Sequence, residues 1–363
     1  IKFIMKVCII GNNLTSLALA KALINKEIFV DIFYKNKKVN ADRSRTIGIS
    51  KSNIDFFNKN ITNIDRLLWK IKKIKIYSEN SKKDAIIKFK SQNDPLFSIL
   101  KNTKLIKKLI SELKRNKLVN FKNNTHNNDP LSRDYDLLIN CDLKHKLTKK
   151  YFSKKFEKKY NSTAFTTIIN HKKILLNDTA VQIFTNKGPI AFLPISSEKT
   201  SLVFSVRLKN DKNDLDIKKM INKFNNFYEI KKINKISKFN LSSLNLREYY
   251  KDNIMAFGDL LHKVHPLAGQ GFNMSIRDIK VLLEIIDYKI NLGLPIDKDV
   301  CTEFQNKTKS KNFVFSEGVD LIYELFNSEN KIRNNLIDKT VKLIGKNKLL
   351  NKYFKRIADE GLQ

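Results

Sequence analysis

The residue types best suited to chemistry in this sequence gather in one stretch, GDLLHKVHPLAGQGFN, which runs from Gly258 to Asn273. The chain holds only 10 glycines and 6 prolines, and three of those glycines and one of those prolines fall here. Glycine lets the backbone approach a bulky ligand closely, and the free N–H groups at a helix N-terminus attract electron-rich atoms. A carboxylate such as that of Asp259 can accept hydrogen bonds from ligand hydroxyls. The combination favours a cofactor site over a simple helix cap, which would need only one or two of these residues.

Two elements must position this stretch. Residues 253–257 are apolar and predict a strand that ends at the Gly-Asp pair, and apolar side chains repeat on one helical face after the last glycine. A strand followed by a helix places the turn between them at the edge of a sheet. The candidate binding residues are Gly258, Asp259, Pro266, Gly269, Gln270, Gly271 and Asn273. We expect His262 and His265 to orient their neighbours through hydrogen bonds rather than to carry protons.

The beginning of the chain supplies a second candidate site. Residues 7–10 and 28–33 are short apolar runs typical of buried parallel strands, and a helix with small side chains lies between them. This order places a helix N-terminus beside the carboxyl end of the first strand. Gly11, Asn13 and Ser16 occupy the turn.

The remaining pattern indicates an α/β protein with a second domain. Residues 104–114 have the periodicity of an amphipathic helix. The section from about 151 to 250 alternates as antiparallel strands do, and the sequence beyond about 296 is helical.

The charge and the cysteines restrict the function classes. Lys and Arg number 70 against 36 for Asp and Glu, which gives a net charge of +34. The lysines are spread over nearly every segment, so a background bias explains them better than a specific nucleic-acid site, although a general attraction to an anionic membrane would follow. Three isolated cysteines and five histidines without HExxH spacing indicate no metal site and a reducing compartment. No apolar run reaches membrane-span length, and the N-terminus has no signal-peptide layout.

Several stretches resemble one known family. GDLLHKVHPLAGQGFNMSIRD resembles the signature of flavin-dependent aromatic hydroxylases, and more narrowly that of the ubiquinone-biosynthesis branch. SRTIGISKSNIDFF is similar to a second segment of that branch, with Arg45 and Ser50 matching, and the resemblance implies that Arg45 also binds the cofactor. AVQIFTNKGPIAFLPIS and the C-terminal helices are similar to two more, so the resemblance spans essentially the whole chain.

The resemblance implies a fold and a chemistry. The fold would be α/β, with a Rossmann-like FAD-binding domain, an antiparallel-sheet substrate domain and C-terminal helices. The cofactor would be FAD, reduced by NAD(P)H, and the reaction with O2 would hydroxylate an electron-rich aromatic ring. Asp259 would bind the ribityl chain near the pyrophosphate. Pro266 and the backbone from Gly269 to Gly271 would lie along the flavin ring, supported by Asn273.

The family's organisation also implies domain boundaries. The FAD-binding domain would be discontinuous, formed by residues 1–150 and 245–295. The substrate domain would occupy 151–244, with a contribution from about 65–95, and a C-terminal helical region would occupy 296–363.

The sequence departs from the family at the adenosine end of the site. The family's G-x-G-x-x-G positions are Gly11, Asn13 and Ser16, so only the first glycine is present. Tyr34 stands where an acidic residue is expected, and Asp142 is followed by leucine where the family has glycine. Two accounts follow: an active enzyme that tolerates these changes, or a weakly FAD-binding, non-catalytic member of a ubiquinone-biosynthesis assembly. A plain dinucleotide dehydrogenase is disfavoured, because its glycine fingerprint should be early and complete.

The resemblance further implies a polyprenyl-phenol or quinone-type substrate and no specific nucleic acid. The basic amphipathic stretch 338–357 would either lie on a membrane surface or pack on the second domain. We therefore expect a cytoplasmic protein, with peripheral association at the inner face of the membrane and a biosynthetic complex as further possibilities.

Overall fold

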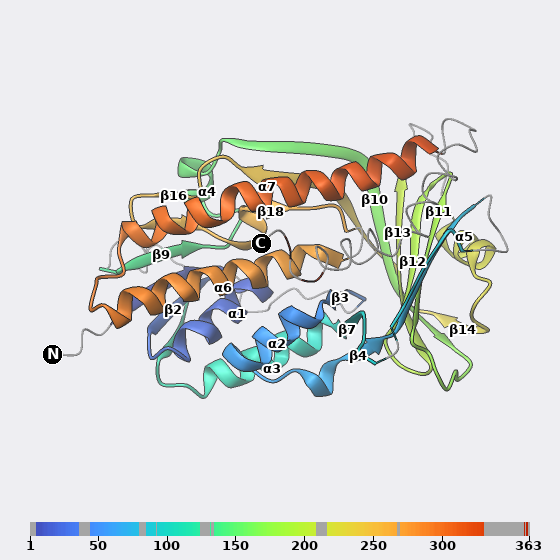
Figure 1. Cartoon of the computed structure of the whole chain (residues 1–363), viewed down its shortest axis with the longest axis horizontal. Helices are drawn as coiled ribbons and strands as arrows, with labels where there is room; N and C mark the ends of the chain where they lie inside the picture. The colour runs from blue at the N-terminus through green and yellow to red at the C-terminus, as the bar shows by residue number, and fades with distance from the viewer. Residues whose placement is uncertain are drawn as a thin grey trace.

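Two sheets organise the molecule, and they lie toward opposite ends of its long axis (Figure 1). The chain is seen here in a computed structural model, which describes residues 5–35, 44–79, 85–91, 93–123, 131, 134–207, 216–266, 269–329, 359 and 361. Helices α6 (Gln270–Asn291) and α7 (Lys298–Glu329) run along the long axis beside the first sheet.

The first sheet has six strands in the order β16-β17-β9-β1-β2-β8. Its strands are β1 (Lys6–Ile10), β2 (Phe29–Tyr34), β8 (Val119–Asn123), β9 (Leu137–Asn140), β16 (Tyr250–Lys251) and β17 (Ile254–Ala256). All neighbouring pairs are parallel except β16 with β17. Because parallel strands end at the same edge, the turns after β1, β9 and β17 meet there.

Helix packing explains the apolar content of the N-terminal segment. α1 (Leu14–Ile24) is buried over almost its whole length and contacts both α3 (Asn102–Lys114) and α6. The amphipathic helix predicted over 104–114 is present in α3, and it buries Leu105, Leu109 and Leu113. These helices and the first sheet enclose the largest apolar core of the described residues.

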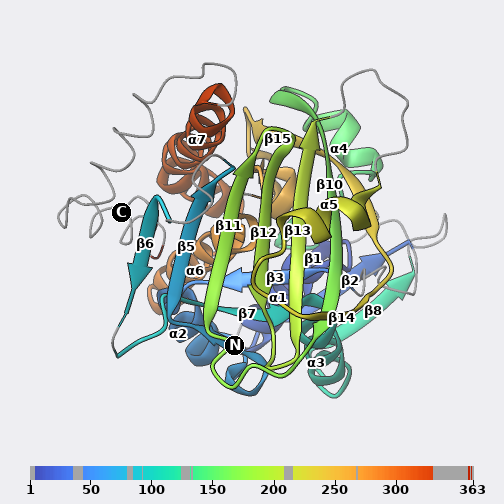
Figure 2. The ribbon, with the colours of Figure 1, turned by 90° about the vertical axis from the view of Figure 1, so that its right-hand side faces the viewer.

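The second sheet has nine strands and is mostly antiparallel, as the alternation predicts (Figure 2). It follows the order β18-β15-β10-β13-β12-β11-β5-β6, with β14 paired to β10. Its strands are β5 (Lys73–Ser78), β6 (Ile87–Lys90), β10 (Lys155–His171), β11 (Thr179–Thr185), β12 (Gly188–Pro194), β13 (Lys199–Arg207), β14 (Ile230–Ile233), β15 (Ser237–Leu246) and β18 (His262–Lys263). α5 (Ile217–Phe224) packs on one of its faces through an apolar cluster.

A small third sheet lies between the two parts of the fold. It joins β3 (Thr46–Ile49), β7 (Phe97–Lys101) and β4 (Trp69–Ile71). α2 (Lys51–Asn60) follows β3 directly and contacts α6. The remaining short elements are η1 (Asp65–Leu67), α4 (Lys146–Tyr151) and η3 (Gly258–Leu260).

The predicted fold class is confirmed as α/β, with a Rossmann-like parallel sheet, a mostly antiparallel second sheet and helices toward the C-terminus. α7 lies within the region 296–363 that the sequence predicts to be helical, while the basic stretch 338–357 lies outside the described residues. In the part of the chain that the structure describes, no helix is both long and apolar enough to cross a membrane.

Candidate cofactor site

The start of α6 depends on a glycine. Gly269 is the N-cap and has φ +65°, a left-handed conformation that side chains with a Cβ rarely adopt. A Cβ there would lie 3.5 Å from the backbone nitrogen of Gly48 in β3, an ordinary van der Waals contact, so it is the backbone conformation that requires glycine. The Gly269 N–H donates to the carbonyl of Pro266 at 3.2 Å, so this predicted residue shapes the same turn.

Gln270 and Gly271 are the first two residues of α6. Gly271 borders open space, and Gln270 carries a buried acceptor that lacks a donor among the described residues. A Cβ on Gly271 would meet no heavy atom within 4 Å. Gln270 is buried, and its side-chain Oε1 has no hydrogen-bond partner among the described residues. A buried acceptor without a partner is uncommon in folded proteins and indicates a missing donor. A ligand beside this turn would have room and could supply that donor.

Asn273 holds the turn in place. Its buried carboxamide Oδ1 accepts from the Ser50 backbone N–H at 3.1 Å and from the Asn53 side chain at 3.0 Å. Its Nδ2 donates to the Gly48 carbonyl at 3.1 Å and to the Gly269 carbonyl at 3.4 Å. One side chain therefore ties the first turn of α6 to β3 and to the beginning of α2.

Gly258 forms the other side of the site. It follows β17 with φ +67°, and a Cβ there would lie 2.9 Å from Thr15 Cγ2 in the first turn of α1. Glycine thus allows η3 to pack against α1. Asp259 is the acidic residue of η3, and its side chain is exposed at the edge where β1, β9 and β17 end.

The glycine-poor first turn still forms. Gly11 has φ +110°, and its N–H donates to the Phe33 carbonyl at 2.7 Å. Asn13 is the N-cap of α1, and its Oδ1 accepts from the Ser16 backbone N–H at 3.0 Å. The Asn13 Nδ2 donates to the Cys141 carbonyl at 2.9 Å, which ties the turn to the end of β9. The side chain that replaces a family glycine therefore caps the helix.

The predicted adenosine position contains no acidic side chain, but a buried one lies three residues earlier. Tyr34 ends β2 and packs near Phe121, whereas Asp31 is buried within the strand. Asp31 accepts hydrogen bonds from Lys122, from Tyr135 at 2.6 Å and from Asn120 at 3.0 Å. Burial alone would raise its pKa, but these hydrogen bonds together hold the pKa below its ordinary value. Asp31 is therefore a structural ion-pair partner.

Arg45 lies beside the third sheet. Its side chain is exposed immediately before β3, and its carbonyl accepts from the Asn102 N–H at 3.2 Å. Asp142 follows β9, and its carboxylate accepts from the Lys144 N–H at 2.8 Å. The three cysteines are buried and form no disulfide with one another, and burial raises the pKa of the Cys141 thiol strongly, with the Asp259 charge adding to the effect.

His262 belongs to a buried polar chain that sequence reasoning found only in part. His262 Nε2 lies 2.5 Å from Asp278 Oδ2, and the Asn312 side chain donates to Asp278 Oδ1 at 2.9 Å. The orienting role of His262 stays a prediction, and Asp278 is the partner through which it would act. Asp278 ends the quoted signature and could have been selected from it, whereas no spacing in the sequence links Asn312 of α7 to the site.

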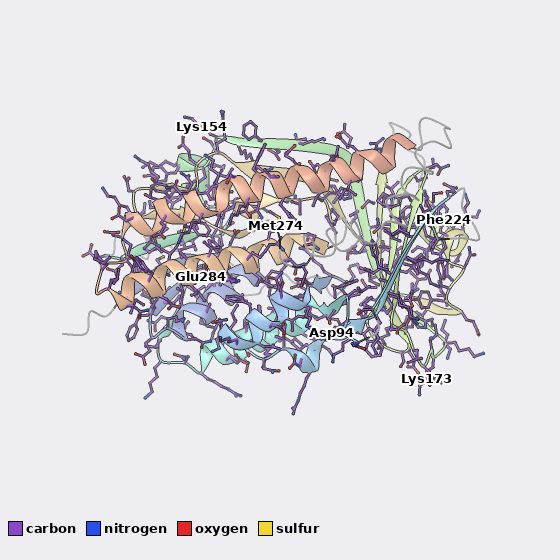
Figure 3. All side chains as sticks on the ribbon, in the orientation of Figure 1. Asp94, Lys154, Lys173, Phe224, Met274 and Glu284 are labelled. Atoms are coloured by element: carbon purple, nitrogen blue, oxygen red, sulfur yellow. The ribbon has the colours of Figure 1, made fainter. Side chains whose placement is uncertain are left out.

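His265 is enclosed by aromatic rings. It stacks on Tyr323 with a centroid distance of 3.9 Å and meets Tyr160 edge-on at 5.1 Å. Burial lowers the pKa of His265 to about 3, so the ring is neutral at physiological pH. Met274 of α6 is buried nearby against Val264 in the layer between α6 and α7 (Figure 3).

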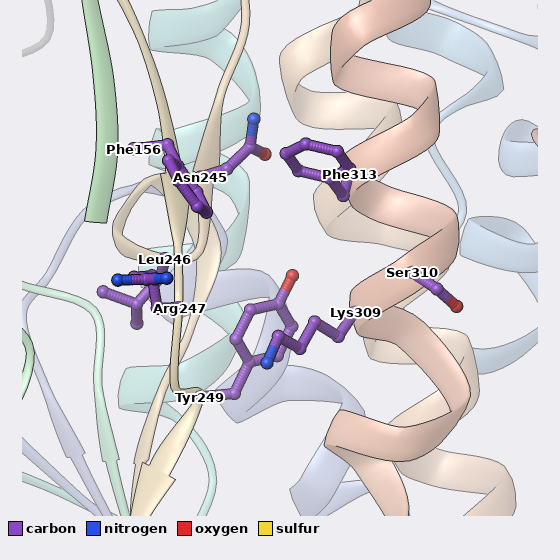
Figure 4. Close-up of a pocket in the computed structure, with 8 residues that line it drawn as sticks. All are labelled: Phe156, Asn245, Leu246, Arg247, Tyr249, Lys309, Ser310 and Phe313. Carbon is purple, nitrogen blue, oxygen red and sulfur yellow. The ribbon is translucent and has the colours of Figure 1, made fainter. Parts of the chain in front are cut away.

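A separate surface pocket of about 380 Å³ lies beside α7 (Figure 4). It is lined by Phe156, Asn245, Leu246, Arg247, Tyr249, Lys309, Ser310 and Phe313. The Asn245 side chain points toward Phe313, and the rings of Phe156 and Phe313 lie 6.0 Å apart. None of the predicted binding residues lines this pocket.

The geometry fits FAD best at the flavin end. The space at Gly271, the unpartnered Gln270 oxygen and the left-handed Gly269 together suit a flat, polar ring. At the dinucleotide end, the cap made by Asn13 occupies the N–H of Ser16, so α1 offers fewer free donors to a pyrophosphate. The residues present therefore fit the cofactor, with a reduced phosphate site.

One segment of the chain matches a known family of FAD-binding domains. Residues 136–291 match the family described as FAD binding domain, which includes the whole Gly258–Asn273 stretch. The chain is 28% identical over 158 residues to the 3-demethoxyubiquinol 3-hydroxylase of Escherichia coli, covering 42% of this chain and 40% of that protein. It is 24% identical over 180 residues to the ubiquinone hydroxylase UbiL of Rhodospirillum rubrum, covering 47% and 41%. The matches thus span about two fifths of these relatives.

Solved structures show the same fold over nearly the whole chain. The p-nitrophenol 4-monooxygenase PnpA of Pseudomonas putida has a TM-score of 0.77 at 12% identity, covering 97% of this chain and 98% of that one. HpxO of Klebsiella pneumoniae, solved with FAD and uric acid, has a TM-score of 0.74 at 12% identity, covering 98% and 97%. At such identities the likeness establishes the fold.

Proposed function

We propose that this chain is a FAD-dependent monooxygenase, because residues 136–291 match the family described as FAD binding domain and the chain is similar to hydroxylases named for ubiquinone biosynthesis. It would hydroxylate the aromatic ring of a polyprenylated phenol or quinone precursor, using NAD(P)H and O2. The observation that carries the proposal is the turn at Gly269–Gly271, which Asn273 holds beside open space and an unpartnered buried acceptor. The substrate class rests on the names of the two relatives.

The protein's own residues would bind and orient. Bound FAD supplies the redox chemistry, namely hydride acceptance from a nicotinamide and activation of O2. The N-terminal end of α6, beginning at Gln270, directs its partial positive charge toward the site, which favours negative charge on a ligand there. Asp259 would accept hydrogen bonds from ribityl hydroxyls, and the start of α1 would hold the pyrophosphate. Burial lowers the pKa of His265 to about 3, so we expect its ring to pack against Tyr160 and Tyr323 rather than to transfer a proton.

A second candidate function is kept because of the first turn. Asn13 and Ser16 replace two glycines, and Asp142 is followed by leucine. A chain with these changes could have become a non-catalytic component of a ubiquinone-biosynthesis assembly. FAD affinity distinguishes the two candidates, since only the enzyme needs a well-occupied site.

The deciding experiment is a titration of the purified chain with FAD, followed by visible absorption after gel filtration. Retention of the flavin spectrum is the expected result. Asp259→Asn should reduce retention, whereas Asp65→Asn should not, because Asp65 occupies the first turn of another 3₁₀ helix, η1, away from the site. Absence of retained flavin at high FAD would reject the monooxygenase and leave the non-catalytic function.

We also propose that the enzyme works at the cytoplasmic face of an anionic membrane, where an isoprenoid substrate would reside. The net charge of +34 supports such an attraction. Co-sedimentation with vesicles of anionic lipid, compared with neutral vesicles at equal salt, tests it. Equal binding to both, or to neither, would reject the membrane proposal.

A further inference from the structure

Asp359 caps α2, although the N-cap residue of that helix, Ser50, lies 309 positions earlier in the sequence. Ser50 is the N-cap of α2, but its side chain makes no capping bond within that helix, and the first turn holds no acidic residue. Asp359 supplies both functions. Its Oδ1 accepts from the Ser52 backbone N–H at 2.9 Å. An oxygen acceptor with a negative charge at this position is the preferred partner of a helix N-terminus.

The contact involves the backbone of Asp359 as well. Its carbonyl accepts from the Ser50 hydroxyl at 2.9 Å and from the Ser52 hydroxyl at 2.7 Å. Three hydrogen bonds from two residues therefore converge on Asp359. Such convergence fixes both the position and the orientation of the residue relative to α2.

The same hydrogen bonds continue into the candidate cofactor site. The Asn53 side chain donates to the Ser50 hydroxyl at 2.9 Å and to Asn273 Oδ1 at 3.0 Å. Asn273 then bonds to the carbonyls of Gly48 and Gly269. A continuous chain of hydrogen bonds thus runs from Asp359 to the turn at the start of α6.

A second contact joins the end of the chain to α6 itself. Gly361 has φ +81°, and a Cβ there would lie 2.8 Å from Arg277 Nε. The Arg277 guanidinium is 4.7 Å from the ring centroid of Phe315 in α7. Burial lowers the pKa of Arg277 to about 10, and the charge of Asp359 acts in the opposite direction. Asp359 and Gly361 therefore contact α2 and α6, the two helices that Asn273 connects.

We propose that Asp359 and Gly361 form a C-terminal clasp that holds α2 against α6 and thereby fixes the distance between the Gly48 and Gly269 backbones. Asp359 is a positioning residue: it acts on the FAD site through Ser50, Asn53 and Asn273. The effect of the clasp on FAD binding rests on the proposed function, whereas its effect on α2 does not require a bound cofactor.

The test uses the whole chain and four variants. Asp359→Ala removes the charged acceptor, Asp359→Asn keeps an oxygen that can cap, and Gly361→Ala introduces the close contact with Arg277. Asp216→Ala is the matched control. Asp216 is the N-cap of α5, the helix that packs on the second sheet, and its carboxylate accepts from the Lys219 N–H at 3.1 Å. FAD affinity is measured by fluorescence titration, and hydrogen exchange is measured on the flavin-free proteins.

The expected result is a loss of FAD affinity of up to about tenfold for Asp359→Ala, the fold-change reached when the whole free-energy cost of the lost helix cap falls on the FAD-bound conformation. Gly361→Ala should weaken binding similarly, while Asp359→Asn and the Asp216 control should stay within about twofold of the wild type. In the flavin-free Asp359→Ala protein, residues 50–55 and 269–273 should exchange faster, and α5 should not.

Two results would overturn the clasp. One is unchanged exchange at 50–55 and 269–273 in both Asp359→Ala and Gly361→Ala. The other is unchanged FAD affinity in both variants while the wild type binds FAD. Failure of the wild type to bind FAD would instead reject the proposed function, and the exchange experiment would still decide the clasp. If Asp359→Ala does not fold, Gly361→Ala carries the comparison, and Asp359→Asn serves as its control that retains the cap.

Discussion

The side chain of Asn13 caps α1, with its Oδ1 3.0 Å from the backbone nitrogen of Ser16. The family that the sequence resembles has a glycine at this position. The Ser16 hydroxyl also contacts Asn13 Oδ1 at 2.9 Å and the Asn13 carbonyl at 3.1 Å. The Ser16 N–H is thus bonded within the helix start. Asn13 therefore occupies the Ser16 N–H, which could otherwise donate to a phosphate oxygen.

Asn13→Gly should tighten FAD binding and lower stability. The variant frees the Ser16 N–H for a phosphate oxygen and removes a side chain from the turn, but it loses the bond to the Cys141 carbonyl. We expect a stability loss of about 1 kcal/mol and an affinity gain of several-fold. Fluorescence titration and urea unfolding measure the two effects. Equal or weaker FAD binding would show that the cap does not compete with the pyrophosphate.

Gly258→Ala should destabilise the protein and displace Asp259. The left-handed backbone and the 2.9 Å contact with Thr15 Cγ2 together should cost about 1–3 kcal/mol. Thr15→Ser removes that methyl group, so the double variant should regain part of the loss. Thermal unfolding of both variants and of Thr15→Ser alone provides the comparison. A double variant no more stable than Gly258→Ala would assign the entire cost to the backbone.

Asp31→Asn should destabilise the first sheet and alter the response to acid. The pKa of Asp31 is depressed in the folded state, so its contribution is present above the unfolded pKa and is lost as pH falls through the folded pKa. The wild type should therefore lose this contribution below about pH 4. Removal of one partner from the buried pair with Lys122 should cost about 3 kcal/mol at neutral pH. Urea unfolding at pH 7 and at pH 3 should show a smaller difference between variant and wild type at the lower pH.

His265→Phe should reduce the pH dependence of stability. Because burial depresses the His265 pKa to about 3 from 6.5, the unfolded chain binds the extra proton first. The neutral ring's stabilisation is therefore full above about pH 6.5 and is lost as pH falls toward about 3. Between pH 6.5 and pH 5 the wild type should lose about 2 kcal/mol more than the variant. Phenylalanine keeps the stacking on Tyr323, and parallel curves for the two proteins would contradict the neutral histidine.

The sequence was informative where one segment supplies its own geometry. The glycines at 258, 269 and 271 predicted a ligand-facing turn, and two of them adopt left-handed conformations. The apolar runs at 7–10 and 28–33 predicted β1 and β2, because buried parallel strands are mostly apolar. The position of each run along the chain was sufficient for these predictions.

The sequence was not informative where partners come from distant elements. No spacing indicates that Asp359 caps α2 or that Asn312 supports Asp278. From the sequence, Asn13 could be recognised only as a position where the family's glycine is absent. Its hydrogen bond to the Cys141 carbonyl joins residues 128 positions apart.

The sequence by itself thus determined the α/β fold class, the strand–turn–helix units and the glycine turn of the candidate FAD site, since these depend on local conformation and periodicity. Only the tertiary structure decided which side chains hold that turn and which donors remain free for a cofactor. The physical reason is that a buried hydrogen-bonding group must find a partner, and which partner it finds depends on packing in three dimensions.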